Sequence, residues 1–173
     1  MNRRELLGAL AAAAVSRVAR AQAPAVDWIE FYNTHTRETV RETFRNASGF
    51  VPEALTKFQH VLRDHRSGES HRIDPELYVL LVDVAAAAGA EPRYEIISGF
   101  RSSDTNEKLR SAGGGQAKRS QHMEGRAIDV RLKGVTTARL REVATSLRRG
   151  GVGFYERSDF VHIDTARVRY WTG

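Results

Sequence analysis

Two segments of the chain, residues 127–132 and 161–164, alternate between apolar and polar positions. Because successive side chains of a strand point to opposite faces, this alternation predicts two β-strands that each bury aliphatic residues on one face. The other face would carry Asp129 from the first strand, and His162 and Asp164 from the second. We therefore expect the two strands to present polar side chains to the same side.

Apolar residues at helical spacing predict three longer helices, over residues 52–66, 75–89 and 136–149. Each pattern is bounded by residues that typically begin or end a helix. These residues are Pro52, Asp74, Gly89, Thr136 or Thr137, and the pair Gly150 and Gly151. The helices are therefore predicted to have defined ends and one buried face each.

Two histidines and one carboxylate near the predicted strands form a candidate metal-ligand set: His122, Asp129 and His162. His122 lies in a loop, which Gly125 separates from the first strand. A zinc ion that acts on substrate needs three protein ligands and an open position for water, and two His with one carboxylate are a usual combination. The histidines expected to be structural or surface residues are His35, His60, His65 and His71. We predict one catalytic zinc ion bound by the first three residues.

Shorter patterns complete the predicted fold. Residues 26–32 and 94–98 indicate strands, residues 104–109 a short helix, and residues 111–116 a flexible loop that could move over a substrate. The order of all these elements predicts one α+β domain over residues 24–173. We expect a small antiparallel sheet that carries the metal site on one face, with the helices packed behind it.

A ten-residue motif at positions 120–129 reads Ser-x-His-x-x-Gly-x-Ala-x-Asp. It resembles, at every specified position, the first motif of the zinc D-Ala-D-Ala carboxypeptidases and murein endopeptidases, whose fold is shared with the Hedgehog signalling domain. Residues 97–102 resemble the family's Ser-Gly-Tyr/Phe-Arg-Ser segment. Similarity over residues 31–36, 150–155 and 165–171 extends the resemblance to nearly all of the chain after its first 23 residues. The chain is most similar to an exported bacterial subgroup of murein endopeptidases.

This resemblance implies hydrolysis of an amide bond in peptidoglycan, and a role for each matched residue. In the family the His and Asp of the motif, here His122 and Asp129, bind zinc, and a late His, here His162, is the third ligand. The Arg of the upstream segment contacts substrate, which implies this role for Arg101. A guanidinium fork suits the carboxylates of peptidoglycan stem peptides. Ser120 would hydrogen-bond substrate or cap its own loop.

The proton acceptor of the implied reaction has two main candidates. The resemblance implies Asp159, because the family places an acid, more often Glu, three residues before the last His. Strand alternation instead places Asp164 on the same face as His162, and Asp159 on the opposite face unless the chain turns near Ser158. Asp164 could be the base or could orient a metal ligand. Glu156 is a third candidate.

The first 23 residues are predicted to be an export leader. Arg3 and Arg4 precede an apolar stretch over residues 6–15, and Ala-Arg-Ala at residues 19–21 is a cleavage signal of the A-x-A type. Paired arginines before such a stretch are typical of the twin-arginine route. The stretch is shorter than the roughly 20 residues of a spanning helix. We therefore expect no stable membrane span and a location in the periplasm or cell envelope, with an uncleaved amphipathic anchor as the alternative.

Composition limits the possible partners and the sources of stability. The 173-residue chain has no cysteine and a formal net charge of +6, and subtracting the leader's net +3 leaves +3. Without disulfides, an exported domain depends on packing and bound metal for its stability. The remaining positive charge suits an anionic cell-wall polymer, so peptidoglycan is the expected partner. Aromatic and basic residues do not interleave as on a nucleic-acid surface, so nucleic acid is not an expected partner.

Three functions are compatible with these patterns. The first is a zinc amidase of the cell wall. The second is a non-catalytic, zinc-containing module that binds the wall or a partner, and the third is a scaffold without zinc. Metal content distinguishes the third from the others, and digestion of the wall distinguishes the first two. Cleavage of a D,D or an L,D bond, by an endopeptidase or a carboxypeptidase, is compatible with the sequence.

Overall fold

A mixed eight-stranded sheet forms the centre of the computed structural model, which describes residues 27–113 and 115–173. The strands lie in the order β3-β2-β1-β4-β5-β7-β6-β8, with β1 parallel to β4, β6 parallel to β8, and the other neighbours antiparallel. The strands are β1 (Asp27–Asn33), β2 (Thr39–Asn46), β3 (Gly49–Phe50), β4 (Arg93–Ser98), β5 (Ala127–Leu132), β6 (Gly151–Tyr155), β7 (Phe160–Asp164) and β8 (Arg169–Thr172). The helices are α1 (Pro52–Val61), α2 (Pro75–Ala88), α3 (Ser103–Ser111) and α4 (Thr137–Leu147).

The predicted α+β class is confirmed, but the sheet is larger than expected and is not purely antiparallel. The additional strands lie toward its two edges. Phe44 is the only buried residue of β2, and β8 has none. A strand that is mostly exposed does not need to alternate apolar and polar residues, which is why the hydrophobic pattern did not reveal β2 and β8.

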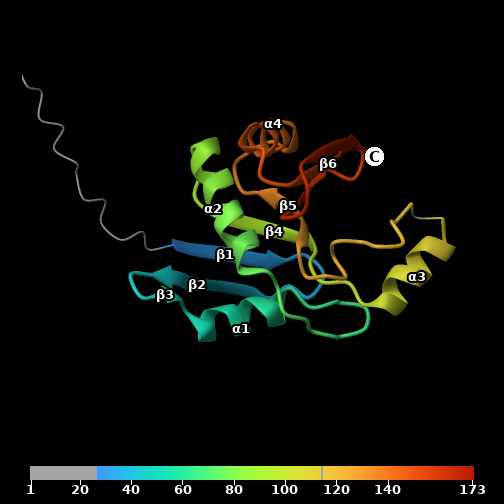
Figure 1. Ribbon diagram of the computed structural model, residues 1–173, viewed down its shortest axis with the longest axis horizontal. Helices are drawn as coiled ribbons and strands as arrows, with labels where there is room; N and C mark the ends of the chain where they lie inside the picture. The colour runs from blue at the N-terminus through green and yellow to red at the C-terminus, as the bar shows by residue number, and fades with distance from the viewer. Residues whose placement is uncertain (1–26, 114) are drawn as a thin grey trace, which may run out of the picture.

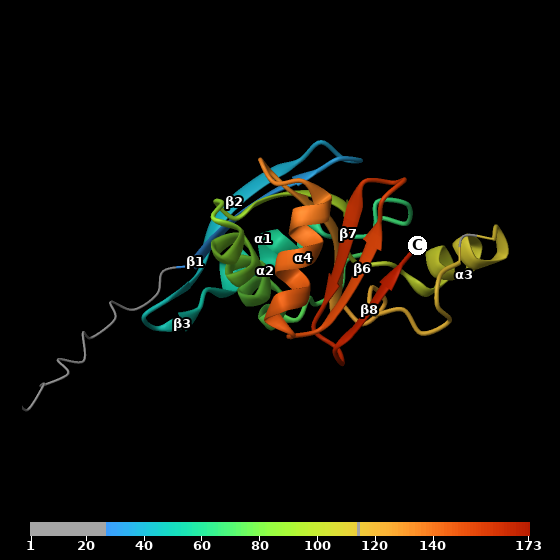
Figure 2. The ribbon, with the colours of Figure 1, turned by 90° about the horizontal axis from the view of Figure 1, so that it is seen from above.

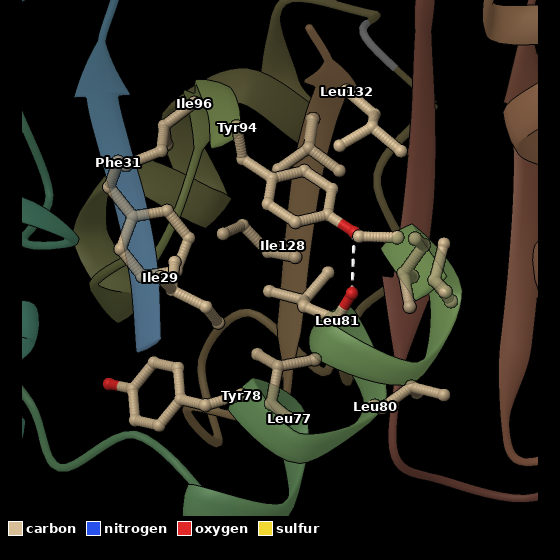
Figure 3. Close-up of a cluster of buried hydrophobic side chains, with 14 of the residues drawn as sticks. Ile29, Phe31, Leu77, Tyr78, Leu80, Leu81, Tyr94, Ile96, Ile128 and Leu132 are labelled. Atoms are coloured by element: carbon tan, nitrogen blue, oxygen red, sulfur yellow. Dashed lines mark hydrogen bonds between the residues drawn. The ribbon is translucent and has the colours of Figure 1, made fainter. Parts of the chain in front are cut away.

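Helices α1, α2 and α4 pack along one face of the sheet, whereas α3 lies beside the sheet at one end (Figures 1 and 2). The core between helices and sheet contains the aliphatic positions of β5 and β7 that the alternation predicted to be buried. Ile128 and Val161, for example, have no exposed surface. Figure 3 shows part of this core, where the Tyr94 hydroxyl donates a hydrogen bond of 2.7 Å to the Leu81 carbonyl oxygen. The polar face of the same two strands therefore lies on the side away from the helices.

The ends of helix α2 follow the predicted caps. The Asp74 side chain accepts a hydrogen bond from the Glu76 backbone N–H, Pro75 occupies the first turn, and Gly89 ends the helix with a φ of 72°. A cap of this kind contributes about 1 kcal/mol of stability. Helix α1 is shorter than predicted, because it ends at Val61 and the chain then turns through a loop that buries Asp64.

The end of helix α4 differs from the prediction. Thr136 caps its start, but Arg148, with a φ of 53°, ends it before the two glycines. Gly150 and Gly151 instead allow close approach of the chain to β7, since a Cβ on Gly150 would collide with the Asp164 carbonyl oxygen. These glycines are therefore required by packing within the sheet and do not end the helix.

The predicted leader over residues 1–23 lies outside the described residues, and so does Val26, the first residue of the expected strand 26–32. Among residues 27–113 and 115–173, no helix combines the length and the apolar character required to cross a bilayer.

Candidate metal centre

Strands β5 and β7 bring two of the predicted ligands face to face. In the antiparallel pairing of these strands, Asp129 lies directly opposite His162. The aliphatic neighbours of both residues enter the core, so the alternation turns both polar side chains to the sheet face opposite the helices. The exposed fraction is only 6% for Asp129 and 7% for His162. The register of one strand pair thus places both groups in the same buried position.

The third residue, His122, comes from the tight turn that precedes β5. Within this turn the His122 N–H donates to the Ser120 hydroxyl, and the Met123 N–H donates to the Ser120 carbonyl. Gly125 has a φ of 63°, and an added Cβ would collide with the Arg72 carbonyl oxygen. A glycine is therefore needed where the turn passes close to that backbone. The Ser120 hydroxyl accepts a bond within its own loop, and its predicted contact with substrate stays a prediction.

Three ligand atoms form a nearly equilateral triangle. His162 Nδ1 lies 2.9 Å from Asp129 Oδ1, and His122 Nε2 lies 3.2 Å from each of these atoms. In a tetrahedral zinc site with bonds of about 2.0–2.1 Å, neighbouring ligand atoms are about 3.3 Å apart. The triangle therefore has nearly the size of one face of such a site.

Hydrogen bonds on the outer side of both rings determine which nitrogen faces the triangle. His122 Nδ1 lies 2.7 Å from the Gly99 carbonyl oxygen, which can only accept, so this nitrogen carries the proton. His162 Nε2 lies 3.0 Å from Asp164 Oδ2 and donates to that carboxylate. The inner nitrogens are thus left as lone pairs when the rings are neutral. Two lone pairs and a carboxylate oxygen that face one another favour a bound cation.

The electrostatics of the cluster agree with this interpretation. Although burial opposes ionisation, the nearby His122 and His162 hold the pKa of Asp129 below its usual range. Burial also opposes the charged form of His162, but hydrogen bonds to Asp129 and Asp164 raise the pKa of this ring. Both shifts have the direction expected where a carboxylate and imidazole rings lie in direct contact. Among the described residues this is the only group of three or more potential ligands close enough to hold a metal ion.

Asp164 lies behind His162 and has no exposed surface. Besides the bond from His162, its oxygens accept hydrogen bonds from the backbone N–H groups of Gly151 and Ala166, and from the Arg169 guanidinium. Despite burial, these bonds hold the pKa of Asp164 below its usual range. Its contacts fix the orientation of the His162 ring.

Asp159, the base implied by the family resemblance, does not lie at the cluster. A turn precedes β7 as that assignment required, and Asp159 has a φ of 50° within it. However, its carboxylate accepts a hydrogen bond of 2.7 Å from the Thr137 hydroxyl and lies 3.2 Å from Arg131 Nε. Its side chain is 64% exposed, and Glu156 is exposed as well. The turn directs this carboxylate toward α4 and β5 rather than toward the triangle.

Arg101 lies on the other side of the triangle, with Nη2 at 3.9 Å from Asp129 Oδ2. Burial lowers the pKa of its guanidinium, and the charge of Asp129 opposes this effect. Weak hydrogen bonds to Asn106 and Ser98 hold the guanidinium, while its buried Nε has no partner among the described residues. Arg101 therefore offers a positive charge directly beside the cluster.

A cavity of about 290 Å³ opens over the triangle, and Arg101 and Ser120 contribute to its lining. Several further lining residues had no role assigned from the sequence, among them Arg119, Tyr155, Arg169 and Trp171. For three of these residues the sequence contains a signal. Alternation along β6 and β8 places Tyr155, Arg169 and Trp171 on the same face of the sheet as His162. The other histidines lie elsewhere: His35 stacks on His65, His71 stacks on Phe100, and His60 is near Glu38.

Comparison with known proteins identifies the family. The family described as "Peptidoglycan L,D-endopeptidase MepK" matches residues 21–171. The chain belongs to this family. It is 39% identical over 176 residues to the peptidoglycan L,D-endopeptidase MepK of Escherichia coli K12, covering 98% of this chain and 97% of that protein. It is also 39% identical over 146 residues to the probable peptidoglycan L,D-endopeptidase MepK of Haemophilus influenzae, covering 84% of this chain and 78% of that protein.

Membership of the MepK family confirms the resemblance to murein endopeptidases that the motif at positions 120–129 indicated. No solved structure matches the chain. The cluster of His122, Asp129 and His162 could hold a metal ion, as expected for a metallopeptidase of this family.

Proposed function

We propose that this protein is a zinc-dependent peptidoglycan L,D-endopeptidase of the periplasm or cell envelope. The observation that carries the proposal is the triangle of His122, Asp129 and His162, whose inner atoms are all acceptors and whose sides are 2.9–3.2 Å long. Two imidazoles and one carboxylate match the donor set of a catalytic zinc site with an open fourth position. The names of the relatives support peptidoglycan as substrate and an L,D bond as the bond cut.

A bound zinc ion would supply a water molecule whose pKa is lowered to about 7, so that hydroxide is available near neutral pH. Other residues of the chain would orient the ligands of this ion. Asp164 holds His162 through Nε2, and the Gly99 carbonyl holds His122 through Nδ1, so both ligands are oriented before substrate binds. Ser120 fixes the turn that carries His122.

Arg101 is proposed to bind a carboxylate of the substrate. Its guanidinium lies at the cavity edge of the triangle and is mostly buried, with an exposed fraction of 8%. A partly desolvated guanidinium forms strong, bidentate hydrogen bonds with carboxylates. Peptidoglycan stem peptides carry such carboxylates close to their peptide bonds. This contact would position the scissile bond over the metal.

We assign Asp164 the role of positioning His162, not of moving a proton. Its two oxygens already accept five hydrogen bonds, and the side chain has no exposed surface. Asp159 keeps the family position of a base, but it could reach the cavity only if its contacts to Thr137 and Arg131 were broken. The roles of the two carboxylates can therefore be distinguished by mutating each residue separately.

Digestion of purified peptidoglycan, followed by mass spectrometry of the released muropeptides, tests the proposal. The zinc-loaded protein should release products cut at an L,D bond, and both chelation and His122→Ala should abolish the release. Bound zinc without any digestion would instead indicate a non-catalytic module. Products cut only at D,D bonds would contradict the proposed specificity.

A further inference from the structure

Two glycines of β6 allow side chains of the edge strand β8 to reach across it. Gly151 pairs with Arg169 and Gly153 pairs with Trp171 in the parallel β6·β8 ladder. A Cβ on Gly153 would lie 2.5 Å from Cε2 of Trp171, and a Cβ on Gly151 would collide with the Arg169 guanidinium. Both side chains therefore lie flat over the glycine positions and extend toward β7.

Trp171 contacts a proposed metal ligand and a neighbouring tyrosine at the same time. Its ring lies against the His162 ring, with 5.1 Å between centroids. Its indole Nε1–H donates a hydrogen bond of 3.0 Å to the Tyr155 hydroxyl oxygen. The Tyr155 ring in turn stacks on Phe160, with 4.5 Å between centroids. The Tyr155 side chain is thus held at two points, because its ring stacks on Phe160 and its hydroxyl oxygen accepts the bond from Trp171.

The hydrogen bond from Trp171 determines what the Tyr155 hydroxyl can do. An indole N–H can only donate, so the phenol oxygen is the acceptor and its own proton remains available. No group of the described residues accepts that proton in a hydrogen bond. Tyr155 lines the cavity over the triangle together with Arg101. A free donor therefore faces the cavity where substrate would lie.

From this geometry we propose that Tyr155 is a catalytic residue that donates a hydrogen bond to the oxyanion of the tetrahedral intermediate, and that Trp171 positions its hydroxyl. The inference rests on the proposed peptidase function. Hydroxide forms a bond to the carbonyl carbon, and the π electrons of the carbonyl move to its oxygen. That oxygen becomes negatively charged and accepts the Tyr155 O–H hydrogen bond. No proton is transferred through Tyr155, so the phenol is unchanged after each turnover.

The first test compares conservative variants of two tyrosines, one inside and one outside the cavity. Tyr155→Phe keeps the ring stacked on Phe160 but removes the donor, and should lower kcat roughly 10²–10³-fold, as for the loss of one oxyanion donor. KM, zinc content and Tm should stay near the wild-type values. Tyr170→Phe is the matched control, because the Tyr170 hydroxyl donates to the Thr145 carbonyl outside the cavity. It should retain wild-type kcat.

The second test measures binding instead of turnover. A phosphinate pseudopeptide of the substrate carries a tetrahedral anion, and its Kd should rise in Tyr155→Phe by about the factor by which kcat/KM falls. The Kd of the product peptides, measured by calorimetry, should not change. A tyrosine that only forms the cavity wall would alter product binding and KM as well.

The third test addresses Trp171. Trp171→Phe keeps an aromatic ring beside His162 but removes the N–H, and should lower kcat less than Tyr155→Phe does. If Trp171 acts through Tyr155, the double variant should have the kcat of Tyr155→Phe alone, which is the non-additivity expected of coupled residues.

The outcomes separate this inference from the proposed function. An active wild-type enzyme whose Tyr155→Phe variant keeps its kcat or its phosphinate affinity would overturn the role of Tyr155. Independent, additive effects of Trp171→Phe and Tyr155→Phe would overturn the positioning role. A zinc-loaded wild-type protein that digests no peptidoglycan would contradict the proposed function itself, and this inference with it.

Discussion

His162 Nε2 donates a hydrogen bond of 3.0 Å to Asp164 Oδ2, so that the opposite ring nitrogen faces Asp129 and His122. The two residues are neighbours on one face of β7, and the carboxylate is completely buried. One strand thus supplies both a proposed metal ligand and the group that orients it. This arrangement leads directly to a prediction about metal affinity.

Asp164→Asn should weaken zinc binding by about 10–100-fold, the usual effect of losing the hydrogen-bond partner of a ligating histidine. The amide cannot reproduce the charge that faces His162 and Arg169. Competition with a chromophoric chelator measures the affinity. Asp159→Asn provides the control and should bind zinc like the wild type. Equal zinc affinity in Asp164→Asn and wild type would show that Asp164 does not orient the ligand.

Asp159→Asn should also retain near-wild-type kcat, because its carboxylate bonds to Thr137 and Arg131 and its side chain is mostly exposed. This expectation follows from the structure and differs from the role implied by the family resemblance. Steady-state kinetics on a purified muropeptide measures it. A general base is worth roughly 10²–10⁴-fold in rate. A loss of that size with zinc still bound would show that the turn before β7 moves and that Asp159 is the base.

Arg101→Lys should reduce kcat/KM for a muropeptide with a free carboxylate beside the cut bond more than for its amidated analogue. Lysine keeps the charge but loses the bidentate fork. The ratio of the two kcat/KM values is the measurement. If both substrates lose the same factor, Arg101 acts by holding its surroundings, such as Asn106 and Ser98, and not by binding the carboxylate.

The free energy of unfolding should decrease on mild acidification, because the pKa of His65 is lowered in the folded protein. Burial, followed by the charge of the stacked His35, lowers the pKa of His65 from its usual 6.5 to about 4. Between these values the unfolded chain binds a proton that the folded chain does not. Unfolding is therefore favoured as the pH decreases from about 6.5 to about 4, and the contribution is constant below that range.

Urea denaturation of the wild type and His65→Gln at several pH values measures this effect. The free energy of unfolding should decrease less steeply with falling pH in the variant, because glutamine has no proton to bind. Parallel curves for the two proteins between pH 6.5 and 4 would contradict the assignment to His65.

The sequence predicted the parts of the molecule in which one local pattern decides the structure. Asp74 and Gly89 bound α2 because caps act over one turn of helix. Alternation in β5 and β7 placed Asp129 and His162 on one face, and the structure brings His122 to them.

Other features depend on contacts between distant segments, which no local pattern contains. Gly151 is required by side chains from β8 and β7, although it resembled a helix stop. The position of the Asp159 side chain depends on the positive φ of its turn and on contacts with β5 and α4. The alternation along β7 contains no information about either. The predicted leader, and with it the twin-arginine route, stays a prediction.

The zinc content of the purified protein, measured by elemental analysis after reconstitution and removal of free metal, tests the central claim most directly. His122, Asp129 and His162 should retain about one zinc ion per chain. His162→Ala should lose the ion while keeping the helix content, because that side chain lies on the face of the sheet opposite the helices. A wild-type protein that retains no zinc would contradict the account.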